Sequence, residues 1–421
     1  MYGYFRSCKA EVASVSVASM DDVTATVAPG SAGHLLQLVR GGIARTRPEL
    51  VTHAGVSRSM VTQRVDGLLA ASLLIEVGQV ASTGGRPANR LAFNADAARV
   101  LVADLGATHA RVAVTDLMGT VLAEQPGDVR IDAGPRVVLD WVRGRFDALL
   151  ADLDPSRPVW GIGIGVPGPV EHSAGRAVSP PIMPGWDGYP IPEHFQDLEV
   201  PVLVDNDVNI MAFGEYRDHW AAEVDDLLLI KVGTGIGCGI VASGRLHRGA
   251  QGAAGDLGHV RVQGHDDTVC TCGNTGCVEA VAGGQAIADR LRSEGYDTPD
   301  ARAVVRLVRE GDSTATRAVR EAGQILGQVV ATAVNLFNPA VIVIAGDVSY
   351  AREQLLAGVR EVVYQRSLPL ATRHLQIVAP RLGDRAGIRG AGEMVVERLL
   401  APVAVDQLVQ RAVDVHTSVS G

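Results

Sequence analysis

The chain has 421 residues, of which 47% are hydrophobic and 20% are charged, an ordinary composition for a globular protein with a full hydrophobic core. At roughly 100–200 residues per domain, this length predicts two or three domains. The sequence contains no apolar run of about 18 residues and no basic segment followed by an apolar block at the start. These absences exclude a transmembrane or secreted protein at the level of sequence, predict no membrane partner and favour a cytoplasmic protein.

Charge is distributed unevenly along the chain. The formal net charge is −9, but the segment from Arg40 to Arg90 contains seven arginines and three acidic residues, a net charge of +4. The other residues therefore carry −13 together. This asymmetry predicts a small basic module that binds nucleic acid, attached to an acidic body.

The first residues precede any periodic pattern. Residues 1–28 are rich in small polar side chains and are predicted to form a disordered leader, with a translation start at Met20 as the alternative. From Ser31 leucines and valines recur at helical spacing, and Gly41-Gly42 ends this first helix.

Signals for two further helices follow. Thr46 and Glu49 have the spacing of a capping box, and Pro48 lies in the first turn, where a missing N–H costs little. This second helix is short because Gly55 predicts a turn, after which Ser57 is expected to cap a third helix. Three short helices in this arrangement predict a helix-turn-helix.

The third helix has an apolar face and a polar face. The apolar stripe consists of Val61, Val65, Leu68 and Leu69. The side chains left exposed near the N-terminal half are Arg58, Ser59, Thr62 and Gln63. Such side chains suit base edges and phosphates, so these four residues are the predicted DNA contacts of the helix.

A strand pair follows the third helix. The segment "LLIEVGQVASTGGRPANRLAFN" predicts two strands around a loop whose tip is Gly84, Gly85, Arg86 and Pro87. A glycine pair that presents Arg86 fits insertion into a narrow minor groove. Residues 29–93 are therefore predicted to form a winged helix-turn-helix DNA-binding domain, with a helical protein–protein module as the alternative.

Residues 94–400 alternate strands and helices. The segments "RVLVADLGATHARVAVTDLMGTVLAE" and "DLLLIKVGTGIGCGIVASGRL" share one plan of strand, glycine turn and strand. Between them we expect a helix near 133–150, the strands of "GIGIGVPGPV" and "PVLVDNDV", and a helix over 208–220, and "AVIVIAGDV" follows as a buried strand. The repeat predicts a two-lobed α/β body with a ligand cleft between the lobes.

One histidine and three cysteines gather in the turn-rich segment 255–280: His259, Cys270, Cys272 and Cys277. One imidazole and three thiolates are the ligand set of a closed tetrahedral Zn²⁺ site. A disulfide between Cys270 and Cys272 would be strained, and cytoplasmic thiols stay reduced, so free thiols are the remaining alternative. Four protein ligands leave no open position, which makes the predicted zinc structural.

The motifs "DLGATHARVAVTD", "GIGVPGPV", "VDNDVN", "GTGIGCG", "GDLGH" and "CTCGNTGCVE" resemble, in this order, those of the ROK family of repressors, open reading frames and sugar kinases. With the winged helix, the resemblance extends to the regulator branch of the family. It implies an actin-like (ribonuclease-H-like) duplicated α/β fold, a sugar in the interlobe cleft and a structural zinc.

The resemblance also implies site residues. Those expected to contact a monosaccharide are Gly168, Asn206, Asp207, Asp256, His259 and Glu279. His259 would use one ring nitrogen for zinc and the other for sugar, which orients the ring and fixes its tautomer. Asp256 stands where kinases of the family usually have glutamate, so its reach is shorter by one methylene.

Two functions from different classes follow from these residues. In a sugar kinase, Asp207 would be the catalytic base that takes the proton of the sugar hydroxyl. The phosphate-binding turns, however, depart from the kinase pattern; they are Gly106, Ala107 and Thr108 in the first lobe and Gly233, Thr234 and Gly235 in the second. His109, Cys238 and Asp347 also replace residues usual in the kinases, and the carboxylate of Asp347 would repel triphosphate.

The sequence therefore favours a sugar-responsive transcriptional regulator, a repressor whose body keeps a sugar site and has lost phosphoryl transfer. A homodimer or homotetramer is expected to bind a palindromic operator in double-stranded DNA, because two-fold symmetry in the protein meets two-fold symmetry in the site. For the C-terminal tail, residues 401–421, helix and disorder both remain open.

Overall fold

The structure is a computed structural model that describes residues 28–79, 89–351 and 353–419. The predicted leader and the wing tip with Arg86 lie outside these ranges. The winged helix-turn-helix is confirmed: it consists of α1 (Ala32–Arg40), α2 (Arg47–Ala54), α3 (Arg58–Ala70), and the antiparallel strands β1 (Leu74–Gln79) and β2 (Asn89–Phe93).

The caps of these helices follow the sequence signals. The Thr46 hydroxyl accepts from the Glu49 N–H, and the Ser57 hydroxyl accepts from the Met60 N–H, each at 3.3 Å. The expected capping box differs in one detail: the Glu49 carboxylate accepts from the N–H of Arg45, at 2.6 Å, one residue before the cap. The Thr46 cap thus satisfies one orphan N–H of the first turn, that of Glu49, and the Glu49 carboxylate ties the residue before the cap to the helix.

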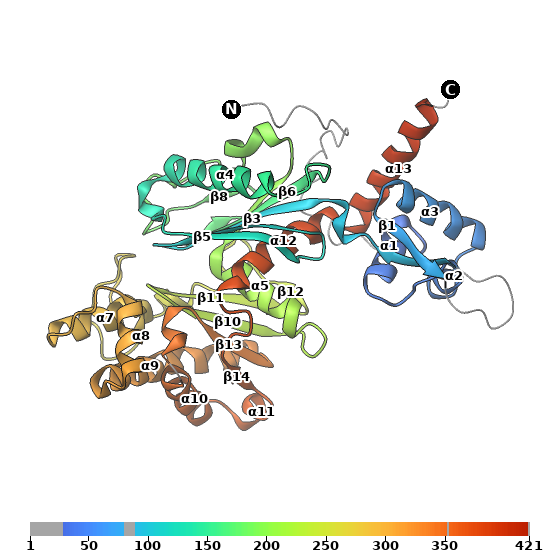
Figure 1. Ribbon diagram of the computed structural model, residues 1–421. Coiled ribbons are helices and arrows are strands. Elements are labelled where there is room, and N and C mark those ends of the chain that lie inside the picture. The colour runs from blue at the N-terminus through green and yellow to red at the C-terminus, as the bar shows by residue number, and fades with distance from the viewer. Residues whose placement is uncertain (1–27, 80–88, 352, 420–421) are drawn as a thin grey trace.

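The first lobe of the body is built on a five-stranded sheet in the order β5-β4-β3-β6-β9. Its strands are β3 (Arg99–Leu105), β4 (Ala110–Thr115), β5 (Val121–Gly127), β6 (Val159–Val166) and β9 (Val202–Asn206). The helix α4 (Pro135–Ala151) covers one face, and α12 (Ala386–Leu399), which arrives from the far end of the chain, covers the other (Figure 1).

The second lobe repeats this plan with the order β12-β11-β10-β13-β14. Its strands are β10 (Leu227–Val232), β11 (Ile236–Ala242), β12 (Arg245–Leu246), β13 (Val341–Ala345) and β14 (Gln376–Val378). The helix α5 (Asp207–His219) packs against β10 and β11 on the side of the first lobe. The helix α5 directly follows β9 of the first lobe and so lies between the lobes, whereas the helices of the second lobe itself are α6 (Val278–Ala282), α7 (Gly284–Ser293), α8 (Ala301–Glu310), α9 (Ser313–Phe337), α10 (Gln354–Arg366) and α11 (Pro369–Thr372).

Strand pairing confirms the duplicated, actin-like two-lobed fold. In each sheet a central strand pairs antiparallel with the strand after the glycine turn and parallel with a later strand: β3 with β4 and β6, and β10 with β11 and β13. Short elements connect this frame: β7 (Val170–Glu171), β8 (Arg176–Ala177) and the 3₁₀ turns η3 (Ala95–Ala97), η4 (Ile131–Ala133), η5 (Ile191–Leu198), η6 (Leu257–His259), η7 (Asp347–Tyr350) and η8 (Gly383–Arg385). Within the described ranges, the helices include none long and apolar enough to cross a membrane.

The C-terminal segment is a helix that returns to the winged helix-turn-helix. The helix α13 (Pro402–Val419) packs on α1 and α3, as Figure 1 shows at the right of the molecule. Val405 and Val409 are buried in the same hydrophobic cluster as Leu35 of α1, and the Asp406 carboxylate accepts from the Gly33 N–H at 2.9 Å. The DNA-binding module thus shares one core with the last helix, although the sequence placed them at opposite ends.

Gly33 permits this contact because a β-carbon there would lie 2.3 Å from Pro402 Cα. We expect Gly33→Ala to lower stability by about 1–3 kcal/mol through overpacking, visible as a lower Tm and faster hydrogen exchange in α1. Gly144→Ala in α4, where a β-carbon meets nothing within 4 Å, is the matched control and should raise stability by about 0.5–1 kcal/mol. Equal effects of the two substitutions would contradict the tight contact.

Candidate functional site

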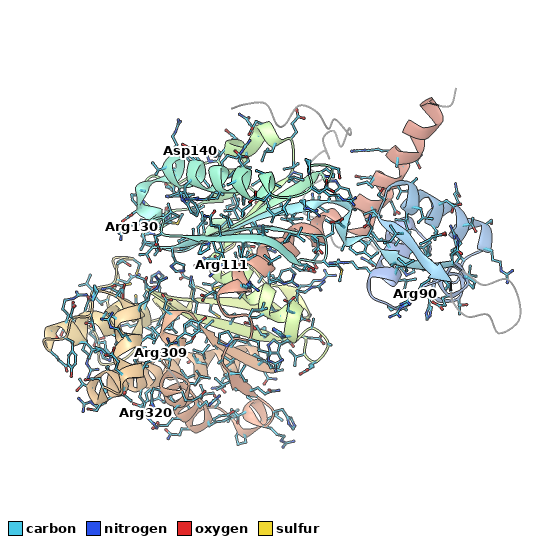
Figure 2. All side chains as sticks on the ribbon, in the orientation of Figure 1. Arg90, Arg111, Arg130, Asp140, Arg309 and Arg320 are labelled. Carbon is cyan, nitrogen blue, oxygen red and sulfur yellow. The ribbon has the colours of Figure 1, made fainter. Side chains whose placement is uncertain are left out.

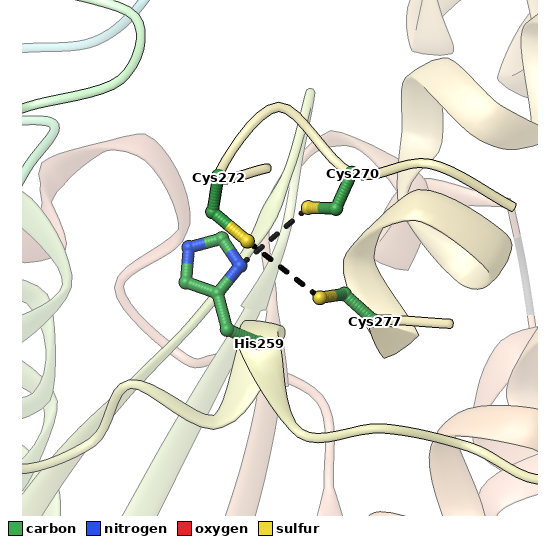
Figure 3. Close-up of side chains that lie close together, drawn as sticks. All are labelled: His259, Cys270, Cys272 and Cys277. Atoms are coloured by element: carbon green, nitrogen blue, oxygen red, sulfur yellow. Dashed lines mark hydrogen bonds between the residues drawn. The ribbon is translucent and has the colours of Figure 1, made fainter. Parts of the chain in front are cut away.

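The predicted metal ligands come together in one cluster. His259 ends η6, Cys270 and Cys272 lie on the loop after it, and Cys277 is the N-cap of α6. Their ligand atoms all lie within 4.8 Å of one another (Figure 3). Two isolated antiparallel β-bridges, Val269 to Thr275 and Arg261 to Cys277, bring the ends of the loop together.

The distances in the cluster fit a tetrahedron of ligands. The sulfurs of Cys272 and Cys277 are 3.7 Å apart, and Cys270 Sγ lies 3.6 Å from His259 Nδ1. A disulfide would bring two sulfurs to about 2.05 Å, whereas ligands at about 2.0–2.3 Å from a central ion lie near these separations. Burial and the neighbouring thiols raise the pKa of Cys277 to about 12, whereas a hydrogen bond from the Asn274 backbone lowers that of Cys272 to about 7. A bound cation would favour the thiolate form of all three cysteines. The residues therefore form a Cys₃His cluster able to hold a metal ion.

The ring of His259 has two different surroundings. Nδ1 faces the cysteines, while Nε2 points to the other side, where Asp256 Oδ1 lies 3.8 Å away. The Asp256 side chain is 58% exposed. The prediction that His259 contacts both a metal and a sugar requires one ring nitrogen for each. In this orientation Nδ1 is placed for the metal, and Nε2 is the nitrogen that remains for a sugar.

The first lobe supplies a second group of predicted sugar contacts at the end of β9. Asn206 is the N-cap of α5: its side-chain oxygen accepts from the N–H groups of Val208 and Asn209, and its amide nitrogen donates to the Gly168 carbonyl at 3.0 Å. Asp207 is the first residue of α5 and is almost fully buried. Asn206 thus holds the "PGP" turn against the helix start.

Glu279 connects the cysteine loop with the second glycine turn. Its Oε2 accepts from the Ile236 N–H at 2.8 Å, and a β-carbon on Gly235 would lie 2.2 Å from the same oxygen. The glycine is therefore required for this approach. Because Glu279 lies two residues after Cys277, a change in the loop reaches the second hairpin directly.

Two ion pairs at the same place were not expected from the sequence. Lys231 Nζ donates to Asp207 Oδ2 at 2.5 Å, and Arg248 Nε donates to Asp205 Oδ2 at 2.6 Å. The lysine and arginine belong to the second lobe, whereas the two aspartates end or follow β9 of the first. The sequence offered one signal that could have drawn attention to Lys231: it is one of only two lysines in the chain.

The first glycine turn borders a cavity of about 720 Å³ through Gly106, whereas Gly233, Thr234 and Gly235 of the second turn are not among its lining residues. Gly106, His109 and Lys231 line it, and the predicted sugar-contact residues do not. Figure 2 labels two of its arginines, Arg111 on the first lobe and Arg309 on the second. Asp347 also lines it, but Arg302 Nε lies 3.9 Å from its carboxylate, which weakens the expected repulsion of phosphate.

The turns themselves are closed by backbone hydrogen bonds. Gly106 N–H donates to the His109 carbonyl at 2.8 Å, and the Ala107 carbonyl accepts from Ile131. In the second lobe, the carbonyls of Gly233 and Thr234 accept from the first N–H groups of α7. These donors at the start of α7 therefore face protein carbonyls.

The predicted DNA contacts on α3 form an exposed surface. Arg58, Ser59, Thr62 and Gln63 are all exposed, and Val61, Val65 and Leu68 are buried on the opposite side. Leu69, expected in the buried stripe, is only half-buried. The Ser59 hydroxyl lies 3.0 Å from that of Ser57, so it is held at the helix start.

The fold and the cleft define a two-lobed α/β protein of the actin-like class that carries a winged helix-turn-helix. The sequence profile described as "ROK family" matches residues 100–398, and the chain belongs to this family. It is similar to the xylose repressor of Caldicellulosiruptor bescii, with 31% identity over 375 residues that cover 85% of this chain and 92% of that protein.

Solved structures show the same relationship. A ROK family transcriptional regulator, described as a homologue of the Escherichia coli MLC protein, matches 90% of this chain and 98% of its own with a TM-score of 0.76 and 26% identity. A ROK family glucokinase from Streptomyces griseus, solved with glucose and AMPPNP, matches 70% of this chain and 98% of its own with a TM-score of 0.60 and 28% identity. The regulator thus shares more of this chain than the kinase does.

Proposed function

We propose that the protein is a sugar-responsive transcriptional repressor that binds a monosaccharide between its lobes and DNA through its winged helix-turn-helix. The observation that carries the proposal is the shared core of α1, α3 and α13, which joins the DNA-binding module to the ROK body. The solved ROK family transcriptional regulator matches 90% of this chain, a share that includes more than the body alone. A ligand acts on DNA affinity only through unequal affinity for two conformations, and closure of the lobes on a sugar supplies such a difference.

The sugar site in this proposal consists of two groups. Gly168, Asn206 and Asp207 come from the first lobe, and Asp256, His259 and Glu279 come from the segment after β12. Each group offers hydrogen-bonding groups suited to hydroxyls, such as the outward Nε2 of His259. A sugar that engages both groups would hold the lobes at one separation.

The ion of the Cys₃His cluster is proposed to be a structural Zn²⁺. Three sulfurs and one imidazole are preferred by zinc, and four protein ligands leave no coordination position for chemistry. Its effect would be to fix the loop that carries His259 and, through Cys277, the start of α6 with Glu279.

DNA recognition is assigned to residues 29–93, with Arg58, Ser59, Thr62 and Gln63 in the major groove and Arg86 in the minor groove. A homodimer or homotetramer would present two such modules to a palindromic operator, with half-sites about 10 bp or a multiple apart. The body comprises residues 94–400, and α13 completes the DNA-binding module.

Phosphoryl transfer is the second candidate, because Asp207 stands where a catalytic base would lie and the glucokinase shares the fold. A coupled assay with ATP and glucose, xylose or N-acetylglucosamine separates the two functions. We expect no turnover from the natural chain, together with a rise in Tm with one of these sugars that Asp207→Asn abolishes, since a ligand of the folded state stabilises it. Turnover that Asp207→Asn removes would establish the kinase instead.

A further inference from the structure

Lys231 forms an ion pair that joins the two lobes at the base of the cleft. It lies on β10 in the second sheet, and Asp207, its partner, directly follows β9 of the first sheet. The pair is well shielded from solvent, with side-chain exposures of 21% and 5%. A pair in such a place affects the lobes far more than an exposed pair, because solvent screens it less.

A second carboxylate, that of Asp104, lines the same cavity as Lys231, and its charge interacts with the ammonium. Asp104 ends near the cleft from β3, packed so closely on α12 that a β-carbon on Gly387 would lie 2.0 Å from its Oδ2. Burial raises the pKa of Asp104 to about 7, while the nearby charge of Lys231 lowers it and that of Asp207 raises it. Further charged groups that act on Lys231, Asp104 or their neighbour His109 are Arg111, Asp347, Asp384 and Arg302.

The ion pair decides what Asp207 can do. Its Oδ1 accepts from the Val208 N–H at 2.9 Å, and its Oδ2 accepts from the ammonium. A carboxylate with a donor on each oxygen can accept a further hydrogen bond on a remaining lone pair. Taking the proton of a sugar hydroxyl is a different task, because a proton on Asp207 would neutralise the carboxylate and end its charge-assisted hydrogen bond with the ammonium.

We propose that Lys231 is the counter-ion of the cleft: it neutralises the carboxylates of Asp207 and Asp104, ties the second lobe to the first, and makes Asp207 a hydrogen-bond acceptor for a ligand hydroxyl instead of a base. Lys231 is a positioning residue in this assignment, since it acts through Asp207. The acceptor part rests on the proposed function, whereas the counter-ion part concerns the free protein.

The counter-ion part is tested by Tm measurements at pH 5.5 and pH 8.5 without ligand. A carboxyl whose pKa is raised on folding holds its proton more tightly in the folded state, so it costs stability as pH rises toward that pKa. Lys231→Met leaves the carboxylates of Asp104 and Asp207 without the cation with which both interact. We expect a fall in Tm at pH 8.5 at least twice that at pH 5.5, and the double variants with Asp104→Asn or Asp207→Asn should recover at least half of it.

Arg143→Met is the matched control, because its side chain is also 21% exposed but its partner Asp197 is 62% exposed. Its effect should be small and equal at both pH values, and Lys231→Arg should restore the natural pH profile. If the Lys231→Met variant does not fold, the double variant Lys231→Met/Asp207→Asn becomes the test. Folding of this double variant would support the role of Lys231 as a counter-ion. A loss in Lys231→Met that is independent of pH, or double variants that recover nothing or fail to fold, would overturn it.

The acceptor part is tested with glucose, xylose and N-acetylglucosamine as probes in the same Tm assay. The sugar that stabilises the natural chain should stabilise Lys231→Arg equally and Lys231→Met with at least tenfold weaker affinity at pH 8.5. Undiminished affinity in Lys231→Met overturns the acceptor part. Phosphoryl transfer by the natural chain overturns the proposed function, while the pH profile without ligand reports on the counter-ion in either case.

Discussion

Replacing Cys277 with serine is expected to abolish metal binding, from about one ion per chain to less than about 0.1 by elemental analysis. Cys277 is well anchored in the fold, because its backbone bridges to Arg261 and it occupies the N-cap position of α6. In small zinc-finger peptides, binding of structural zinc contributes roughly 10–16 kcal/mol of folding free energy. Loss of the ion should therefore release residues 255–280, measured as faster hydrogen exchange and proteolysis there.

Cys238→Ser provides the control for this substitution. Cys238 is buried on β11 and is not one of the four cluster residues, its hydrogen bond to the loop comes from the backbone N–H to the Gly255 carbonyl, and burial raises the pKa of its thiol to about 12. The variant removes one thiol yet should keep its metal and a protected loop. Removal of the ion from the natural chain with a chelator should reproduce the Cys277→Ser pattern, and an unchanged loop in the metal-free protein would refute a structural metal.

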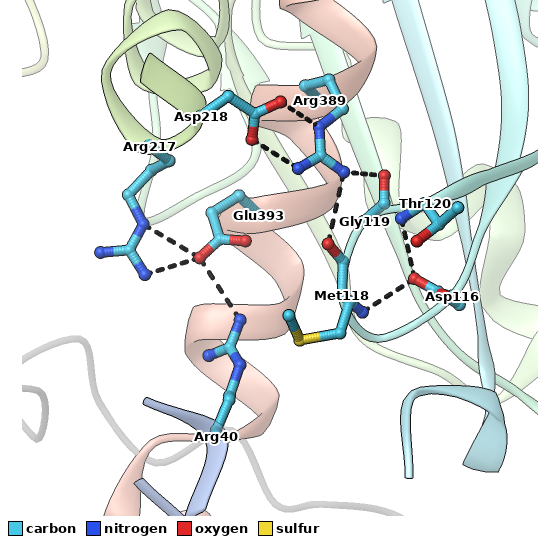
Figure 4. A network of polar contacts seen from close by, with 9 residues as sticks. All are labelled: Arg40, Asp116, Met118, Gly119, Thr120, Arg217, Asp218, Arg389 and Glu393. Atoms are coloured by element: carbon cyan, nitrogen blue, oxygen red, sulfur yellow. Dashed lines mark hydrogen bonds and ion pairs between the residues drawn. The ribbon is translucent and has the colours of Figure 1, made fainter. Parts of the chain in front are cut away.

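Replacing Glu393 with glutamine is expected to loosen the DNA-binding module without unfolding the body. In Figure 4 the Glu393 carboxylate on α12 accepts from Arg217 of α5 at 2.7 Å and from Arg40 of α1 at 3.5 Å. The Glu393 side chain is only 10% exposed, so Glu393→Gln removes a shielded negative charge from both arginines. A hydrogen bond to a charged group contributes about 1.5–3 kcal/mol to stability. Hydrogen exchange in α1 should accelerate several-fold.

Asp218→Asn is the matched variant in the same network. Asp218 pairs with Arg389 of α12, which also donates to the carbonyls of Met118 and Gly119, and none of these residues belongs to the DNA-binding module. It should accelerate exchange around residues 116–120 and leave α1 unchanged. If both variants affect α1 equally, the Glu393 contact has no separate effect on the module.

The Glu393 cluster also lies on a continuous route from the cleft. The helix α5 begins at Asp207 and carries Arg217 near its other end. There the Glu393 carboxylate accepts hydrogen bonds from both Arg217 and Arg40. A two-state shift of α5 on sugar binding would therefore reach α1 through one carboxylate. If an operator is available, Glu393→Gln should reduce the factor by which sugar changes operator affinity, and that factor must equal the effect of operator on sugar affinity.

The features predicted from the sequence are those encoded within short segments. The Thr46 and Ser57 caps have partners three residues away, each glycine turn is closed by a hydrogen bond between residues two or three apart, and the ligands of the cysteine loop all lie within 259–277. Spacing alone therefore predicts them. Lys231 depends on Asp207, 24 residues away, and on Asp104 in the other lobe. No periodic pattern encodes such a pair.

The largest addition by the structure is α13, for the same reason. Gly33 and Asp406 are 373 residues apart in the chain and joined by one hydrogen bond. Amphipathic spacing alone could predict the helix, but its docking site depends on which surface of α1 and α3 is complementary. The small residues Gly33 and Gly67, which a β-carbon would bring within 2.3–2.5 Å of α13, look in the sequence like ordinary helix interruptions.

This return of the chain to its beginning affects biosynthesis. The module formed by α1 to α3 emerges early from the ribosome, yet its hydrophobic surface stays uncovered until Val405 and Val409 have been synthesised. Prematurely terminated products consequently lack part of the core that supports the recognition helix. Truncated polypeptides should compete poorly for promoters, so gene control is left to completed copies.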